Sequence, residues 1–135
     1  MPSSGERPEV YVDRSLGQRI VPEALRSLGF VVHTEVSVFG LVEEGVPDTI
    51  WLERAGGEGW VVLTKDSRIR YRAAEMAALA GGGVRAFVLA AGNLSAAEQA
   101  ARFTANARSI TRACQEAGPF VYAVHADRIA RLFPS

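Results

Sequence analysis

Three aspartates occupy positions at which an α/β protein could carry out chemistry. Asp13 and Asp66 each come at the end of a short apolar run rich in β-branched residues, and Asp48 begins a predicted helix after Pro47. Ligands of open parallel sheets bind outside the carboxyl ends of the strands, and a helix N-terminus favours a carboxylate. Converging carboxylates repel each other unless a cation neutralises them, and oxygen ligands suit Mg²⁺ or Mn²⁺. Any single aspartate could equally be a turn or helix-start residue, so the predicted metal site depends on all three together.

Basic residues surround the third aspartate. Lys65 precedes it, and Arg68 and Arg72 follow at a spacing of four, which would place both arginines on one face of a helix. Such a face could contact the phosphates of a nucleic acid, or it could be an ordinary solvated helix surface. Fifteen basic residues balance fifteen acidic ones, so a preference for a polyanion must come from local clusters of this kind.

The order of apolar runs and helical patterns predicts an α/β fold. A capping-box pattern from Ser95 to Glu98 opens the longest predicted helix. Alternating strands and helices indicate a parallel sheet of about five strands, covered on both faces by helices. The segment 36–47 is predicted to be mostly loop. Strands are predicted at residues 9–12, 30–34, 60–64, 84–90 and 119–124, and helices at 18–28, 48–55, 68–80, 95–117 and 127–133.

Length and composition limit the class of protein. A chain of 135 residues suits one domain, predicted over residues 9–135, with residues 1–8 as a disordered tail rich in Pro, Ser and Gly. The single cysteine, Cys114, excludes an internal disulfide and argues against a cysteine-based zinc site. No apolar run approaches the roughly 20 residues of a membrane helix, and the start lacks the apolar core of a secretory signal. We therefore expect a cytoplasmic protein with no membrane partner.

Other residue types that often carry chemistry have simpler interpretations. His33 and His125 are far apart and lack a metal-ligand spacing, so both are predicted to be structural or exposed. Cys114 lies on the apolar stripe of the helix predicted at 95–117, which indicates a core position. Trp51 and Trp60 are predicted to be core residues or walls of a groove.

Three motifs resemble a known family. VYVDRSLG with Asp13, GVPDTIWLERA with Asp48 and WVVLTKDSRI with Asp66 are similar to the acidic motifs of PIN-like domains. These domains are metal-dependent ribonucleases that include the VapC-type toxins of bacterial toxin–antitoxin pairs. The resemblance runs from about Val10 to Leu132 and implies a three-layer α/β/α sandwich.

The resemblance also implies a site. Asp13, Asp48 and Asp66 would bind Mg²⁺ or Mn²⁺, which lowers the pKa of a bound water and stabilises charge on the phosphate. Thr64 would orient Asp66 or that water through a hydrogen bond. RNA is the implied substrate, and a cognate antitoxin and a second copy of the chain are the implied protein partners. The candidate RNA contacts are Lys65, Arg68, Arg72 and Arg14.

The chain departs from the family pattern in two places, which keeps a second interpretation open. Related domains often carry an acid and an amide directly after the first aspartate, whereas this chain has Arg14 and Ser15. No fourth acid has a clear match: Glu43–Glu44 and Asn93 lie in predicted loops, and Asp127 comes too late. A catalytically degenerate PIN-like module that binds RNA or a protein is therefore the alternative to an active ribonuclease.

Two other classes with aspartates at strand ends fit less well. A phosphoryl-acceptor receiver domain would carry paired acids after its first strand and a lysine after its fifth, and both are missing here. A phosphatase with a DxD nucleophile motif is excluded because Ser15 occupies the second acidic position.

Overall fold

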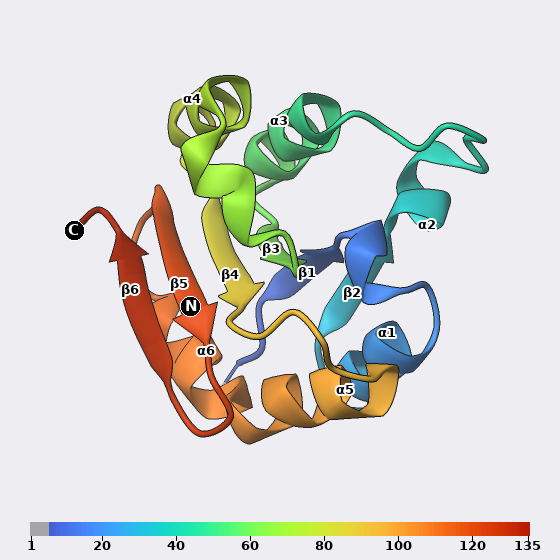
Figure 1. The fold of residues 1–135 in the computed structure, drawn as a ribbon, viewed down its shortest axis with the longest axis vertical. Helices are drawn as coiled ribbons and strands as arrows, with labels where there is room; N and C mark the ends of the chain where they lie inside the picture. The colour runs from blue at the N-terminus through green and yellow to red at the C-terminus, as the bar shows by residue number, and fades with distance from the viewer. Residues whose placement is uncertain (1–5) are drawn as a thin grey trace.

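A computed structural model describes residues 6–135, which form a six-stranded sheet with helices on both faces (Figure 1). The strand order is β2-β1-β3-β4-β5-β6; the first five strands are parallel, and β6 is antiparallel to β5. The strands are β1 (Glu9–Val12), β2 (Val31–Thr34), β3 (Val61–Thr64), β4 (Arg85–Leu89), β5 (Phe120–Val124) and β6 (Ile129–Phe133). The helices are α1 (Ile20–Ser27), α2 (Glu35–Phe39), α3 (Asp48–Glu58), α4 (Ala73–Gly81), α5 (Ala96–Ala105) and α6 (Ala107–Ala113), with 3₁₀ turns η1 (Arg14–Leu16) and η2 (Ser67–Tyr71).

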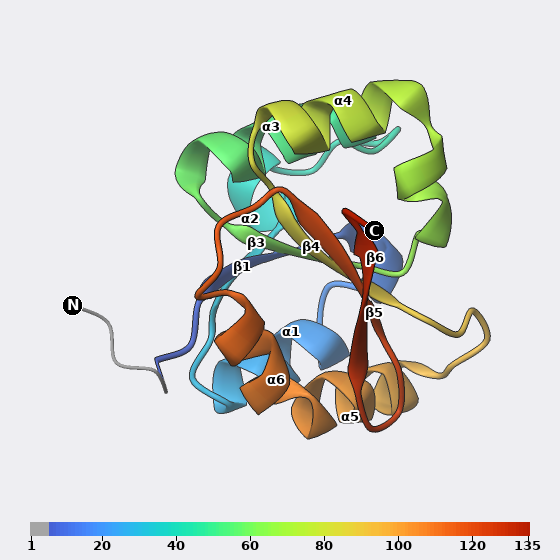
Figure 2. The ribbon, with the colours of Figure 1, turned by 90° about the vertical axis from the view of Figure 1, so that its left-hand side faces the viewer.

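The elements form three layers, which confirms the predicted α/β/α class. Helices α3 and α4 cover one face of the sheet, and α1, α5 and α6 cover the other (Figure 2). Parallel strands need crossover connections, and the helices that supply them bury both faces of the sheet. No helix within residues 6–135 is long and apolar enough to cross a membrane.

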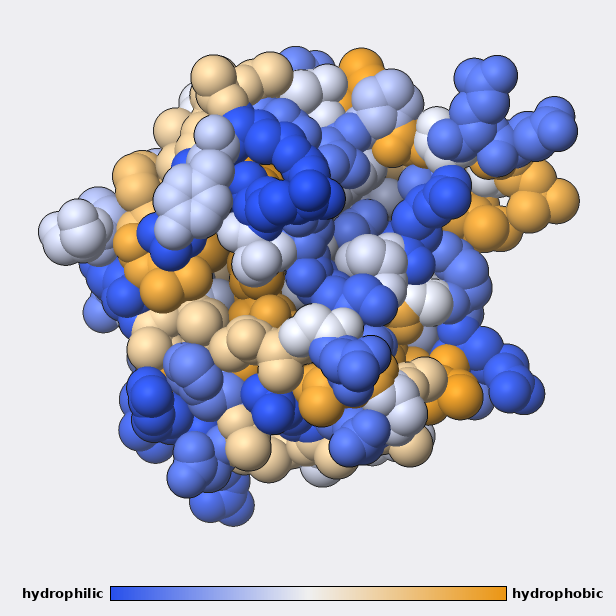
Figure 3. Space-filling model, viewed as in Figure 1, coloured by the Kyte–Doolittle hydropathy of each residue, from blue (hydrophilic) through white to orange (hydrophobic). Residues whose placement is uncertain are grey.

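The strand order contains a switch point between β1 and β3. From β1 the chain crosses to β2 on one side, then returns to form β3 on the other side of β1. In open α/β sheets, a crevice opens at such a point, outside the carboxyl ends of the strands. The space-filling view of this face shows hydrophilic side chains gathered around a hollow near its middle (Figure 3).

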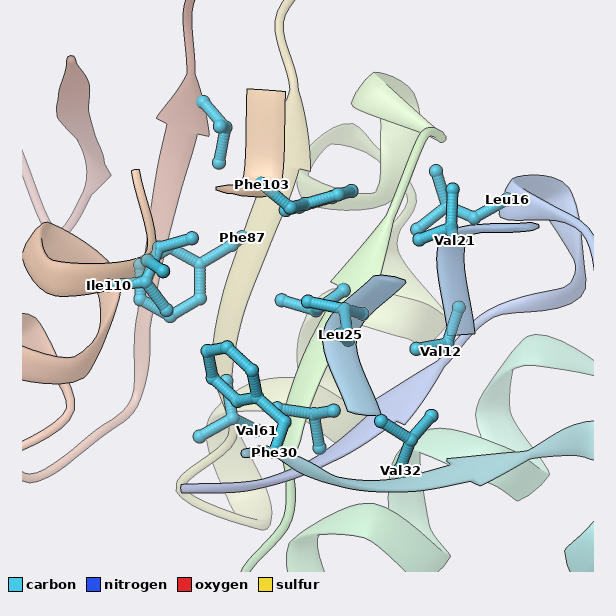
Figure 4. Close-up of a cluster of buried hydrophobic side chains, with 14 of the residues drawn as sticks. Val12, Leu16, Val21, Leu25, Phe30, Val32, Val61, Phe87, Phe103 and Ile110 are labelled. Carbon is cyan, nitrogen blue, oxygen red and sulfur yellow. The ribbon is translucent and has the colours of Figure 1, made fainter. Parts of the chain in front are cut away.

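Side chains alternate between the two faces of the central strands. Along β1, Val10 and Val12 join the cluster beneath α1, α5 and α6, whereas Tyr11 points to the opposite cluster with Trp51. In the close-up, Leu25 and Phe103 reach the sheet from their helices (Figure 4). This period of two, with both faces apolar, is what a parallel strand buried on both sides requires.

The C-terminal prediction is wrong. Residues 127–133 were expected to form a helix, but Ile129–Phe133 form β6 and pair with the free edge of β5. The connection is a tight turn in which the backbone N–H of His125 donates to the carbonyl of Arg128 at 2.8 Å. An edge strand presents unpaired backbone groups that a following segment can satisfy, and this pairing overrides local helical preference.

Two predicted helices are interrupted in the structure. The helix expected at 95–117 begins as predicted with the Ser95–Glu98 capping box, but it divides into α5 and α6 at Asn106. The buried Asn106 amide donates to the carbonyls of Arg102 and His125, both at 2.8 Å, and so ties the break to the end of β5. The helix expected at 68–80 divides into η2 and α4, because Arg72 between them has an extended backbone.

Two further element boundaries differ from the predictions. The segment 36–47 contains α2, whose capping box pairs Thr34 with Ser37 rather than with the usual Glu or Gln. Helix α3 continues through the glycines at which it was expected to stop, and ends at Gly59 in the left-handed conformation, φ 74°. A Cβ on Gly56 would lie 3.0 Å from the Cα of Gly82, so this glycine allows close packing of α3 on α4.

Candidate functional site

Asp13 lies at the carboxyl end of β1, where the backbone continues the pairing with β3. Its N–H donates to the carbonyl of Leu63 at 2.9 Å, and its side chain is only 6% exposed. The Oδ2 atom accepts hydrogen bonds from the hydroxyls of Ser15 at 2.7 Å and Thr64 at 2.8 Å. The carboxylate is therefore held by one hydroxyl from each side of the switch point.

The same two hydroxyls organise the chain after β3. Ser15 Oγ accepts the backbone N–H of Lys65 at 3.2 Å, and Thr64 Oγ1 accepts the N–H of Asp66 at 3.1 Å. Thr64 was expected to orient Asp66 or a water. It orients the backbone of Asp66 and the side chain of Asp13, which links two candidate ligands through one hydroxyl.

Burial raises the pKa of Asp13 above its ordinary value. Hydrogen bonds from Ser15, Thr64 and the backbone of Arg14 lower it, and the nearby charge of Asp48 raises it. Burial has the largest effect, so holding this carboxylate ionised costs folding free energy in the absence of a cation.

Asp48 and Asp66 share one arginine. Arg72 Nη1 lies 2.6 Å from Asp66 Oδ2, 3.6 Å from Asp48 Oδ2 and 3.5 Å from Glu75 Oε1. The hydrogen bond to Asp66 raises the pKa of the guanidinium, which therefore stays charged. The indole N–H of buried Trp51 donates to Asp48 Oδ1 at 3.0 Å and so orients that carboxylate from the core side.

The three aspartates and Ser15 line a pocket of about 610 Å³, hereafter the acid pocket. All three predicted aspartates line it, and so do three of the four predicted RNA contacts; Arg72 is held to one side by the acids. Of the predicted contacts, Arg68 has a side chain 76% exposed and lies 3.7 Å from Asp66. The lining residues are Asp13, Arg14, Ser15, Glu44, Gly45, Val46, Asp48, Lys65, Asp66, Ser67, Arg68 and Gly92.

Glu35 is an acid near the site that the sequence analysis missed. It directly follows β2, is 4% exposed, and accepts the backbone N–H of Val46 at 3.2 Å. Its Oε2 lies 3.7 Å from Arg14 Nη1, and a side chain at Gly45 would collide with that guanidinium. Arg14 is thus partly engaged by an acid, and the loop beside it carries a glycine at φ 79°, a conformation that favours glycine.

Glu35 shows the same signal as the predicted ligands, a carboxylate directly after a strand. Glu35 was not among the predicted ligands because it borders the segment predicted as loop, whereas in the structure it is the first residue of α2. Of the fourth-acid candidates, Glu44 lines the acid pocket, whereas Asp127 is exposed in the turn between β5 and β6.

Tyr11 supplies a buried hydroxyl beside the acids. Its oxygen is the one buried side-chain polar atom in the described part of the chain without a hydrogen-bond partner. Burial raises the pKa of Tyr11 well above its ordinary value, and the charges of Glu35, Asp13 and Asp48 raise it further. A water or hydrated cation among these acids would satisfy the hydroxyl.

The donor chemistry fits a hard divalent cation, since carboxylates and hydroxyls line the acid pocket. Among residues 6–135, however, no three acidic, histidine or cysteine side chains form a ready-made ligand group. A positive charge already lies between Asp48 and Asp66, in the form of the Arg72 guanidinium. Cation binding by all three aspartates therefore requires Arg72 to move aside.

The remaining candidates have structural positions, as expected. His33 stacks on Trp60 with ring centroids 3.9 Å apart, and its Nε2 contacts Glu9. Cys114 packs against the core cluster, and burial raises the pKa of its thiol to about 12. Neither residue contacts the acid pocket.

Comparison with known proteins identifies relatives. Residues 8–91 match the family model described as a PIN like domain, and this segment includes all three aspartates. The chain is 36% identical over 124 residues to a Mycobacterium tuberculosis (H37Rv) protein named "Putative ribonuclease VapC45", covering 91% of this chain and 90% of the relative. No solved structure matches at a significant level.

Replacing Asp13 by Asn should raise the melting temperature of the metal-free protein at pH 7, because it removes a buried charge. The pKa of Asp13 is raised in the folded state, so the unfolded chain, with a pKa of about 3.9, loses its proton first as pH rises. The carboxylate therefore lowers stability in full above its folded pKa, and this cost declines as pH falls, so the melting temperatures of wild type and Asp13→Asn should converge as pH approaches the unfolded value. Each kcal/mol relieved corresponds to about 4 °C in a domain of this size.

Thermal melts in EDTA from pH 4 to 8 measure this difference, with the exposed Asp127→Asn as control. A lower melting temperature for Asp13→Asn at pH 7 would mean that the hydroxyl hydrogen bonds outweigh the cost of burial.

Replacing Arg72 by Gln should leave Asp48 and Asp66 without their shared positive charge. The metal-free variant should melt below wild type, and it should bind Mn²⁺ several-fold more tightly because no guanidinium competes with the ion. Titration calorimetry and melts with and without Mn²⁺ measure both effects. Arg68→Gln is the matched control, since the Arg68 side chain is exposed and lies 3.7 Å from Asp66 without lying between two carboxylates. Equal Mn²⁺ affinity in all three proteins would exclude competition by Arg72.

Proposed function

This chain belongs to the PIN-like domain family, and on that basis we propose that it is an endoribonuclease dependent on Mg²⁺ or Mn²⁺. The observation that supports the proposal best is the convergence of Asp13, Asp48 and Asp66 on one pocket at the switch point of the sheet. The catalytic domain would extend over residues 9–135, and its proposed location is the cytoplasm, where RNA substrates occur.

Asp13, Asp48 and Asp66 are the proposed metal ligands. A divalent cation bound there would supply an activated water and stabilise negative charge on the phosphate. The protein contributes preorganisation: Ser15 and Thr64 hold the carboxylate of Asp13, and Trp51 orients that of Asp48. Groups fixed before substrate arrives need no reorganisation during the reaction, which is what electrostatic catalysis requires.

The basic rim of the acid pocket supports RNA as the substrate. Lys65 and Arg68 border the pocket, and the Arg68 side chain is largely exposed. Arg14 is half exposed while it faces Glu35, so it can also reach a ligand. Arg72 is a different case, because three acids hold it in the metal-free protein. It would contact phosphate only after release by a cation.

The position of Ser15 argues against a degenerate, non-catalytic module. The residues Arg14 and Ser15 were the main reason to consider that alternative. Ser15 hydrogen-bonds to Asp13 at 2.7 Å and to the backbone of Lys65, so it supports the first proposed ligand. The unusual pair therefore leaves the candidate metal ligands in place.

The VapC-type name of the relative supports a toxin role. We propose that the chain is the toxin of a toxin–antitoxin pair and that its protein partner is a cognate antitoxin. A second copy of the chain is a further proposed partner.

RNA cleavage should require Mg²⁺ or Mn²⁺ and stop in EDTA, because all proposed ligands are oxygen donors. Asp13→Asn should reduce cleavage at least about 100-fold, the scale on which loss of one preorganised catalytic group acts. Labelled single-stranded RNA on denaturing gels measures both effects. Metal-independent cleavage, or full activity of Asp13→Asn, would contradict the proposed mechanism.

Expression of the chain without its proposed antitoxin should arrest growth of a bacterial host, because the uninhibited enzyme would cleave the RNA of the host. Asp13→Asn, expressed at the same level on a matched immunoblot, should relieve the arrest. Normal growth with abundant wild-type protein would instead favour the binding-module alternative.

A further inference from the structure

A second, smaller cavity of about 250 Å³ lies beside the acid pocket, and Ser67 borders both. We call it the side cavity. Its apolar lining comes from β4, β5 and β6, and the rest of its lining comes from η2. The apolar residues, hereafter the floor, are Val88, Leu89, Ala90, Ala123 and Leu132, and the η2 residues, hereafter the rim, are Ser67, Arg70 and Tyr71.

The rim presents an aromatic ring to solvent. Tyr71 is 70% exposed and is the only aromatic among the large hydrophobic side chains exposed in the described residues. The guanidinium carbon of Arg70 lies 4.3 Å from the centroid of the Tyr71 ring, within cation–π distance. An exposed aromatic ring beside a cavity can stack against a second planar group, such as another ring.

The charge of Arg70 is not paired with a carboxylate in the described residues. Arg14, Arg68 and Arg72 each lie within 4.0 Å of a carboxylate. Arg70 lies in η2 and forms no ion pair among residues 6–135, whereas Arg68 and Arg72, two residues away on either side, both lie close to Asp66. Its positive charge is therefore available to an anionic ligand that also covers Tyr71.

We propose that the side cavity, Arg70 and Tyr71 form a base-binding subsite for a single-stranded RNA nucleotide next to the phosphate in the acid pocket. This inference rests on the proposed ribonuclease function. A nucleobase has flat apolar faces that stack on an aromatic ring, and polar edges that Ser67 and Arg70 can contact. Its backbone phosphates are attracted by the same arginine.

The local structure couples this subsite to the acid pocket. Asp66 caps η2, since its Oδ1 accepts the backbone N–H of Arg68 at 3.1 Å. The turn that carries Ser67 and Tyr71 therefore starts at a proposed metal ligand. A protein partner would be expected to use a broader apolar surface than this small cavity. The adjoining acid pocket and the unpaired arginine favour a nucleotide.

Equilibrium RNA binding tests the subsite without cleavage. The background is Asp13→Asn in Mg²⁺, and the probes are a short fluorescein-labelled single-stranded RNA and an abasic strand with the same number of phosphates. Tyr71→Ala should weaken binding of the RNA by about tenfold, the scale of one lost base stack, and barely affect the abasic strand. Tyr71→Phe, which keeps the ring, should bind like the background protein.

Arg70→Gln should weaken binding of both strands, because it removes a charge that attracts phosphate. Its matched control is Arg131→Gln. Arg131 lies 5.5 Å from the Tyr122 ring but is paired with Glu116, away from both cavities. The control should leave both affinities unchanged.

Equal RNA affinity of Tyr71→Ala and the background protein, or equal losses of affinity by Tyr71→Ala for the RNA and the abasic strand, would overturn the subsite. Loss of antitoxin binding by Tyr71→Ala with unchanged RNA affinity would overturn it too, in favour of a protein contact. Failure of the proposed function is distinguishable: base-dependent binding without cleavage by the unmutated chain would retain the subsite and reject the nuclease. RNA cleavage by the unmutated chain, with no base-dependent binding, would retain the nuclease and reject the subsite.

Discussion

The buried carboxylate of Asp13 is the constraint on which the rest of the site depends. A charged group this far from solvent persists only if hydrogen-bond donors surround it. Here the donors are Ser15, two residues later in the chain, and Thr64, fifty-one residues later on the neighbouring strand. Thr64 can reach Asp13 only because β1 and β3 pair in parallel and in this register. The sheet topology therefore determines how the proposed site is assembled.

Charge compensation is the second principle of the site. Several carboxylates converge at the carboxyl edge of the sheet, and two arginines separate them: Arg14 faces Glu35, and Arg72 lies between Asp48 and Asp66. Asp13 has no such partner, and burial raises its pKa above the ordinary value. The metal-free protein thus contains a site in which two hydroxyls hold one buried carboxylate and an arginine of the chain itself lies between the other two. A divalent cation bound by the aspartates would supply the positive charge that the Arg72 guanidinium supplies in its absence.

The residues after Asp13 illustrate how a departure from a family pattern can be absorbed. Arg14 and Ser15 replace the acid and amide that related domains often carry. Ser15 takes over a supporting role toward Asp13, and Arg14 pairs with Glu35, which lies at the end of β2 on the other side of β1. The loop beside Arg14 passes at Gly45, whose φ of 79° is a conformation that other residues rarely adopt, and a Cβ there would displace the guanidinium from its present position. The local substitution is thus matched by charge and space elsewhere in the chain.

Sequence alone determined what depends on local pattern: the α/β class, the strands ending at Asp13 and near Asp66, the helix beginning at Asp48 and the capping box at Ser95. Periodicity, caps and apolar runs are properties of neighbouring residues and can be read directly. Only the tertiary structure decided that residues 129–133 pair with β5, that Asn106 divides a helix, that Glu35 pairs with Arg14 and that Arg72 lies between Asp48 and Asp66. Each of these depends on partners distant in sequence or on a turn that changes direction. Such pairings are set by the order of strands and the space between layers, which no local pattern encodes.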